Sequence, residues 1–271
     1  RFMSYLKEED LYENTIFIVT ADNGPEGNDP SDHKPWRDWI KTTIYDRDYD
    51  TLGDQDSYVY IGTEFAQATA SPSHLFKFHM SEGGLRVPLI MSGPGINKGK
   101  NHNFAFVTDI AATISDIVFD EVDERIIGKS LQNSLAGSNE NNYEDFEAVG
   151  LEVTGNSALF KGNYKIVRNR PPNGSNQWEL YNLHEDPGET QDLSKIMPDK
   201  LFELIEDYDQ YAQINGVIEL PLDYQWAEEM TINTFKRNYL PLLLRAVSVI
   251  ALTVFVVIYL RRRWKNSKLN I

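Results

Sequence analysis

An apolar run passes directly into a polar loop in residues 15–27, which read Thr-Ile-Phe-Ile-Val-Thr-Ala-Asp-Asn-Gly-Pro-Glu-Gly. The first part, Thr15–Ala21, is short, continuous and β-branched, and predicts a strand that is buried on both faces. Residues 87–91 form a second such run. Apolar residues then recur at helical spacing over 108–118, with Thr108 or Asp109 placed to cap the start of the helix. The pattern is that of an α/β fold.

A different pattern begins after about residue 137. Short apolar runs separated by turn residues, such as Lys161-Gly162-Asn163, predict a small antiparallel sheet. Pro198 then opens a helix whose apolar residues fall on one face, so we expect this helix to pack on the sheet. The four expected strands are Phe146–Val153, Ala158–Phe160, Tyr164–Val167 and Trp178–Leu183.

Asp22 and Asn23 are the first candidates for a functional site, because they follow the strand predicted over Thr15–Ala21. Ligands of open α/β sheets gather at the carboxyl ends of strands, where a carboxylate and an amide oxygen suit a hard divalent cation. Taken alone, Asp-Asn-Gly is also an ordinary turn sequence. From these three residues alone, a metal site and a plain turn therefore both remain as interpretations.

The wider sequence resembles the sulfatase family of the alkaline phosphatase superfamily, and most closely its bacterial arylsulfatases. Residues 15–27 are similar to the family's strand and metal-binding loop. Residues 60–77 and 78–90, the latter reading Phe-His-Met-Ser-Glu-Gly-Gly-Leu-Arg-Val-Pro-Leu-Ile, look like its second signature. The motifs at 108–117, 128–137 and 178–193 match its helix and C-terminal subdomain. The resemblance spans roughly residues 1–213 and implies the C-terminal part of an alkaline-phosphatase-like α/β sandwich.

The resemblance also implies roles for individual residues. Asp22 and Asn23 become ligands of a calcium ion, and Lys77, five residues before Glu-Gly-Gly, binds the sulfate oxygens of the substrate. Cations held at that place would stabilise the negative charge that builds during cleavage of a sulfate ester. The paired glycines of Glu82-Gly83-Gly84 are expected to allow positive φ and close backbone approach. His33 and His79 either line the pocket or are structural, and His74 stands where related sulfatases often carry Arg.

The formylglycine nucleophile of the family is absent from this sequence. It is made from Cys or Ser in a Cys/Ser-x-Pro/Ala-Ser-Arg motif, and the chain has no cysteine. Residues 70–74 imitate the motif poorly, since Ala70 and His74 replace its first and last residues. We therefore expect this half of an active site to be inactive alone and to need an N-terminal half matured by a formylglycine-generating enzyme.

Charge is strongly segregated along the chain, whose net charge is −15. Residues 236–271 carry eight Lys or Arg and no acid, whereas residues 1–235 carry 18 basic and 41 acidic groups. The strongly acidic composition of residues 1–235 excludes nucleic-acid binding, because such binding depends on clustered Lys and Arg.

Leu240–Leu260 is a mainly apolar stretch whose only charge is Arg245, and its 21 residues suffice to cross a hydrocarbon core of about 30 Å. Five positive charges follow it directly, so we expect a single membrane-spanning helix with a cytoplasmic C-terminus and an extracytoplasmic catalytic domain. A buried core helix with a basic tail is the alternative. We expect three regions: the catalytic α/β part at 1–137, the antiparallel subdomain at 138–235, and the helix with its tail at 236–271.

The expected activity is calcium-dependent hydrolysis of a small-molecule or saccharide sulfate ester. Two alternatives remain at this point. One is a phosphoester or phosphonate-ester hydrolase of the same superfamily, and the other is an inactive, membrane-tethered binding module.

Overall fold

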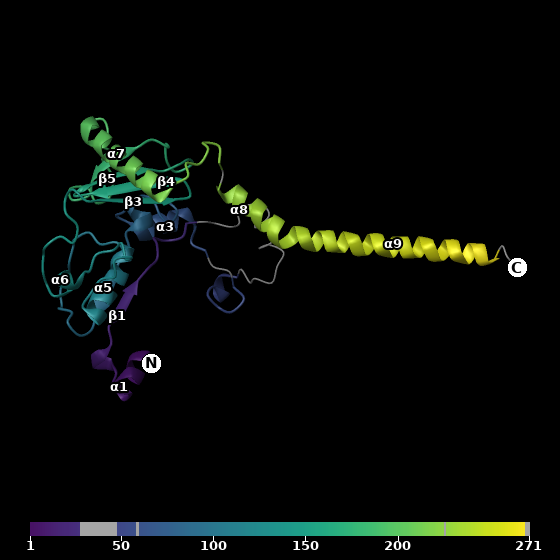
Figure 1. Cartoon of the computed structure of the whole chain (residues 1–271), viewed down its shortest axis with the longest axis horizontal. Coiled ribbons are helices and arrows are strands. Elements are labelled where there is room, and N and C mark those ends of the chain that lie inside the picture. Colours follow the sequence, from purple (N-terminus) through teal and green to yellow (C-terminus); the bar gives the residue numbers. More distant parts are fainter. Residues whose placement is uncertain (28–47, 58–59, 225, 269–271) are drawn as a thin grey trace. The chain divides into compact units, whose positions relative to one another are not determined.

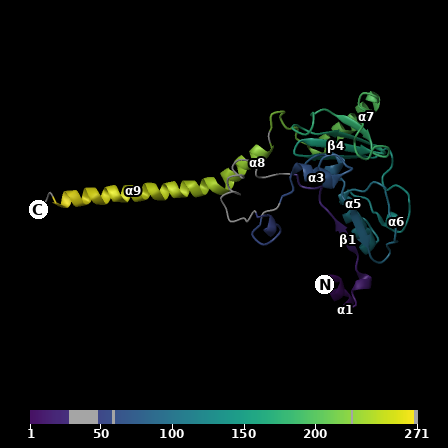
Figure 2. The ribbon, with the colours of Figure 1, turned by 180° about the vertical axis from the view of Figure 1, so that it is seen from behind.

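The computed structural model describes residues 1–27, 48–57, 60–224 and 226–268 of the chain. The chain divides into two compact units, Arg1–Ile218 and Glu219–Ile271. Their ribbons are drawn in Figure 1 and, from behind, in Figure 2. The boundaries expected at residues 137 and 235 stay predictions.

The N-terminal part of the first unit mixes short helices with two strands. Residues 1–14 form a short helix, in which Leu6 is buried, followed by a 3-10 turn. The elements, in order, are α1 (Phe2–Glu8), η1 (Tyr12–Asn14), β1 (Phe17–Thr20), η3 (Tyr49–Thr51), α3 (Gly62–Ala70), α4 (Glu82–Leu85), β2 (Leu89–Ser92), α5 (Val107–Phe119) and α6 (Gln132–Leu135).

Strands β1 and β2 pair with each other in antiparallel orientation, with Ile18 opposite Met91. Both strands were predicted from their apolar runs, but the prediction that the first is buried on both faces is wrong. Val19 and Ile90 are 60% and 61% exposed. The described part of the chain places no layer over these side chains, so an apolar run indicated the strand correctly but not its burial.

Helix α5 begins one residue earlier than expected, and neither Thr108 nor Asp109 is its N-cap. Phe106 takes that position, and the Asp109 carboxylate accepts a hydrogen bond from the Phe106 backbone N–H at 2.7 Å. The other carboxylate oxygen accepts bonds from the Lys129 N–H and the Tyr143 hydroxyl. Asp109 is fully buried, and its role is to join the start of α5 to the segments around residues 129 and 143.

The C-terminal part of the first unit is the predicted antiparallel sheet. Its strands β3 (Ala148–Val153), β4 (Asn156–Lys161), β5 (Tyr164–Arg168) and β6 (Glu179–Asn182) lie in sequential order. The predicted turn at Lys161-Gly162-Asn163 joins β4 to β5, and its Gly162 has a φ of +55°, which glycine adopts without steric cost.

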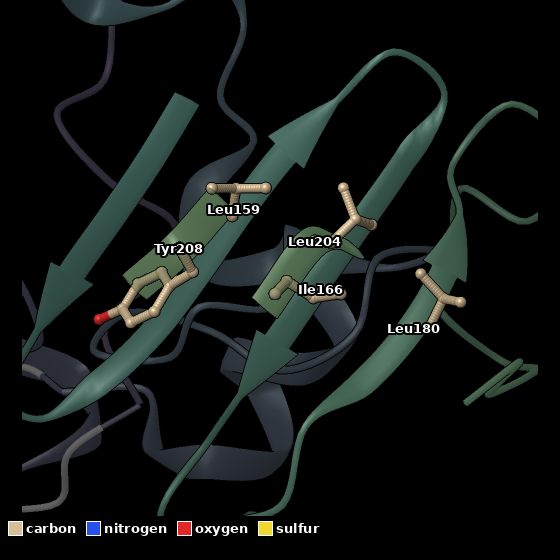
Figure 3. Close-up of a cluster of buried hydrophobic side chains, with 5 residues drawn as sticks. All are labelled: Leu159, Ile166, Leu180, Leu204 and Tyr208. Atoms are coloured by element: carbon tan, nitrogen blue, oxygen red, sulfur yellow. The ribbon is translucent and has the colours of Figure 1, made fainter. Parts of the chain in front are cut away.

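Helix α7 (Pro198–Asn215) covers one face of this sheet, as predicted from its apolar stripe. Leu204 and Tyr208 of the helix pack on Leu159, Ile166 and Leu180 of three strands, as Figure 3 shows. These five side chains are buried and form the core that holds helix and sheet together.

The opposite face of the sheet carries Ala158, Val167 and Tyr181, which cluster with Met80. Leu85 of α4 packs against the same cluster. In both ribbon views α7 lies on one side of the sheet and α3 on the other. The sheet is therefore sandwiched between α7 and the segment that contains Glu82-Gly83-Gly84.

The second unit consists of α8 (Trp226–Thr234), a π-helical stretch at Phe235–Tyr239, and α9 (Leu240–Lys268). Among the described residues, one helix is long and apolar enough to cross a membrane, Ile232–Arg262, and none of its most apolar window is buried. By its length and composition α9 is a candidate membrane span.

Candidate functional site

The loop after β1 places Asp22 and Asn23 two and three residues beyond the end of the strand. Asp22 is exposed and Asn23 is half-buried. Within the described residues, neither side chain has a hydrogen-bond partner. Their oxygens are therefore available to a ligand at the strand edge where the sequence predicted a site.

The same loop is tied to the second signature through backbone hydrogen bonds. The Gly24 N–H donates to the Gly84 carbonyl at 2.9 Å, and the Lys77 N–H donates to the Pro25 carbonyl at 3.0 Å. A Cβ added at Gly24 would lie 1.8 Å from the Gly83 oxygen, so only glycine fits there. The structure thus brings together the two motifs that the sequence singled out.

Lys77 reaches across this junction. Its ammonium group lies 2.8 Å from a carboxylate oxygen of Glu26, and both side chains are partly exposed. Leu75 and Phe78, which flank Lys77, have positive φ angles of 57° and 74°. Such conformations are costly for residues with a Cβ, and they persist only where surrounding contacts hold them.

The paired glycines behave partly as predicted. Close approach is confirmed, because a Cβ at Gly83 would lie 1.9 Å from the Leu75 oxygen and one at Gly84 would lie 2.2 Å from the His79 oxygen. Positive φ is wrong, since both glycines lie in the short helix α4 with right-handed backbone. Tight packing against the Lys77 segment is therefore what requires glycine here.

A buried charge cluster beside these glycines was missed in the sequence. The Lys165 ammonium lies 2.8 Å from both Glu82 and Glu189, and all three side chains are buried. Lys165 stands between Tyr164 and Ile166 of β5, where it lies on the sheet face opposite α7. A lysine directly before the apolar residues Ile166 and Val167 was the available signal, but its partners lie 83 and 24 residues away.

The histidines have separate environments. The His79 ring is half-buried and contacts the Phe76 carbonyl through Nδ1 and the Asn173 amide through Nε2. Burial lowers the pKa of His79, so the ring is neutral at pH 7. His74 is exposed, and its carbonyl accepts a bond from the Gly83 N–H. His33 lies outside the described residues.

The donor set after β1 fits part of a calcium shell. Calcium prefers carboxylate and carbonyl oxygens, which Asp22 and Asn23 supply, but it takes about six to eight of them. The described residues contain no group of three or more His, Cys, Asp or Glu side chains that could hold a metal ion. These two residues therefore fit calcium as partial ligands.

Two family models match the chain. The sulfatase model matches residues 1–120, and the model of the N-sulphoglucosamine sulphohydrolase C-terminal region matches residues 73–210, about half of the chain. The chain belongs to the sulfatase family. The overlap of the two models, 73–120, contains Lys77, α4 and β2.

Relatives within the sulfatase family include an uncharacterized sulfatase of Schizosaccharomyces pombe, 33% identical over 245 residues, which are 83% of this chain and 42% of that protein. An arylsulfatase of Klebsiella aerogenes is 28% identical over 115 residues, 41% of this chain and 24% of that protein. The chain therefore spans less than half the length of these relatives.

The fold is also found among solved structures. The crystal structure of Ps i-CgsB superposes with a TM-score of 0.56 at 17% identity, covering 88% of this chain and 44% of that one. The predicted α/β class with a small antiparallel sheet is therefore confirmed. The roles of Asp22, Asn23 and Lys77 and the calcium ion remain proposals.

Proposed function

We propose that this chain forms part of a sulfuric ester hydrolase that cleaves a sulfate monoester with the help of calcium. The observation that carries the proposal is the junction between two sulfatase motifs. Backbone bonds from Gly24 to Gly84 and from Lys77 to Pro25 hold the Asp22-Asn23 loop against the Lys77 segment. Family membership supports the reaction class.

In this proposal Lys77 binds the sulfate oxygens. Its ammonium is partly exposed and already pairs with a carboxylate, that of Glu26, at 2.8 Å. A sulfate oxygen arriving there would meet the same positive charge. Because that charge is fixed before the reaction, it stabilises the negative charge that grows on the sulfate during cleavage.

Asp22 and Asn23 are the proposed calcium ligands of this chain. When bound, calcium would act as a Lewis acid on the sulfate oxygens. The proposed nucleophile, formylglycine, has no precursor motif among these 271 residues. The 271-residue chain is accordingly proposed to be inactive by itself.

For the substrate we infer a sulfated saccharide or a small sulfate ester. Ps i-CgsB has been solved in complex with k-i-k-neocarrahexaose, and BT4656 with D-glucosamine-2-N,6-O-disulfate, at TM-scores of 0.55 and 0.50 to this chain. The fold shared with these saccharide complexes supports the inference.

We also propose that Leu240–Leu260 anchors the enzyme in a membrane, with the catalytic part outside the cytoplasm. The length of the apolar stretch supports the anchor, and the positive charges from Arg261 onward support the orientation. Lipid is then a partner of this chain through α9.

The test is a comparison of two proteins, the complete gene product and the 271-residue chain, each produced with a formylglycine-generating enzyme. Both are assayed on 4-nitrophenyl sulfate, 4-nitrophenyl phosphate and a phenyl phosphonate ester. We expect turnover of the sulfate by the complete product alone. Preference for phosphate or phosphonate would assign the reaction to the first alternative, and no turnover of any ester would favour the inactive binding module.

A further inference from the structure

Lys165 occupies an exceptional position for a lysine. It is fully buried on β5, on the sheet face that packs against Met80 and α4. Its ammonium donates to Glu82 of α4 and to Glu189 of the loop after β6, each at 2.8 Å. Glu189 also accepts the Glu82 backbone N–H at 2.8 Å. The cluster thus closes a ring between the sheet and the first residue of α4.

Stability alone does not account for such a cluster. Removing three charged groups from water costs several kcal/mol per ion, and apolar residues of similar volume often stabilise a fold as well or better. An ion cluster also fixes the relative orientation of the segments that carry its charges, because its hydrogen bonds are satisfied in one arrangement only. The orientation of α4 is therefore the property that this cluster fixes.

Helix α4 supports the proposed site through its backbone. The Gly84 carbonyl accepts the Gly24 N–H and so fixes the loop that carries Asp22 and Asn23. The Gly83 N–H donates to His74 and fixes the start of the segment that carries Lys77. Both contacts lie within two residues of Glu82, so a shift of Glu82 would move both halves of the site.

Two asparagines, Asn156 at the start of β4 and Asn169 directly after β5, hold the segment between Lys77 and α4. Asn156 donates to the Phe78 carbonyl at 2.7 Å, and Asn169 accepts the Met80 N–H at 2.8 Å. Asn169 also donates to the Ser81 hydroxyl. These contacts hold Phe78 in its positive-φ conformation beside Lys77.

We propose that Lys165, with Glu82 and Glu189, is a positioning group that sets the placement of the Asp22-Asn23 loop relative to Lys77. The proposal rests on the proposed function, since it gives that site its geometry. Lys165 itself contacts neither the proposed metal ligands nor Lys77 in the described structure, so it acts through α4.

The test uses the complete gene product with two substitutions that differ in severity. Lys165→Met removes the charge but keeps much of the side-chain volume. Glu189→Gln keeps an acceptor for the Glu82 N–H and removes one carboxylate charge. Lys161→Met is the matched control, because Lys161 is a neighbouring strand lysine with two carboxylate partners, Glu203 and Asp207, on the α7 side.

The first readout is hydrogen exchange of the Gly24 and Lys77 amides, which does not depend on activity. We expect both amides to exchange faster in Lys165→Met and, to a smaller extent, in Glu189→Gln, and to be unchanged in Lys161→Met. The second readout is the calcium dissociation constant, which should rise by up to roughly 10-fold in Lys165→Met, the lower end of the effect of losing a direct partner of a metal ligand, because Lys165 acts only through α4.

If both amides exchange at the wild-type rate in a folded Lys165→Met protein, the proposal is overturned. If that variant does not fold, wild-type exchange rates in Glu189→Gln overturn it instead. Absence of calcium binding by the wild type would instead contradict the proposed function. The amide exchange would still decide whether Lys165 positions the loop.

Discussion

The Lys77 ammonium and the Glu26 carboxylate lie 2.8 Å apart, one on the segment before α4 and the other on the loop after β1. The pair therefore spans the junction that we propose as the active site. A sulfate bound by Lys77 would compete with the Glu26 carboxylate for the same positive charge. Glu26 is therefore expected to weaken anion binding at Lys77.

Glu26→Gln is expected to strengthen inhibition by inorganic sulfate. Partly exposed ion pairs contribute about 0.2–1 kcal/mol, so the inhibition constant should fall by up to about fivefold. The measurement is sulfate inhibition of the complete enzyme at low ionic strength, with Glu185→Gln as the control because Glu185 pairs with exposed His184. An unchanged or weaker inhibition would mean that Glu26 does not compete with the anion.

Asp22→Ala is expected to remove bound calcium and nearly all turnover of the complete enzyme. The reason is that a hard cation loses a charged oxygen ligand. Calcium content is measured by elemental analysis of the purified, folded protein, beside Asp209→Ala on the exposed surface of α7. Full calcium content in Asp22→Ala would exclude Asp22 as a ligand.

The lowered pKa of His79 predicts a pH dependence of stability. In the unfolded chain the ring takes up a proton near its ordinary pKa of 6.5, whereas burial and the nearby His74 oppose protonation in the fold. The stabilisation is therefore complete above pH 6.5 and is lost as the pH falls below it. Urea unfolding between pH 7.5 and 5.5 should show a steeper loss for the wild type than for His79→Gln, whereas exposed His184→Gln should match the wild type.

Local patterns in the sequence predicted the C-terminal part of the first unit well. The four strands, the turn at Gly162 and the apolar stripe of α7 follow from short apolar runs, turn chemistry and helical spacing. The position of Asp22 after a strand was also predictable locally, whereas Lys77 became a candidate only through the resemblance to sulfatases, and the roles of both residues stay predictions. Each of these local signals lies within a few residues.

Features that depend on distant partners could not be predicted in this way. The exposure of Val19 and Ile90 depends on which layers cover β1 and β2, not on their own residues. The cap of α5 was misplaced because Asp109 bonds back to Phe106 from inside the first turn. The ring formed by Lys165, Glu82 and Glu189 joins segments whose pairing no local pattern encodes.

The proposed membrane anchor predicts that truncation changes the solubility of the protein. The gene product truncated after Phe235 should appear in the soluble fraction, whereas the untruncated protein should need detergent. Orientation is tested with cysteines introduced at Ser194 and Trp264 and an impermeant thiol reagent. We expect labelling of the first in intact cells and of the second only after permeabilisation; untruncated protein that is soluble without detergent would exclude an anchor.

The kinetics of Lys77→Ala on an aryl sulfate, measured in the complete, formylglycine-bearing enzyme, test the central claim most directly. If Lys77 stabilises charge on the sulfate during cleavage, kcat/KM should fall by roughly 100- to 1,000-fold, with most of the loss in kcat. Lys195→Ala, which removes a lysine between β6 and α7, should leave kcat/KM at the wild-type value. A folded Lys77→Ala enzyme that retains wild-type kcat/KM would contradict the account.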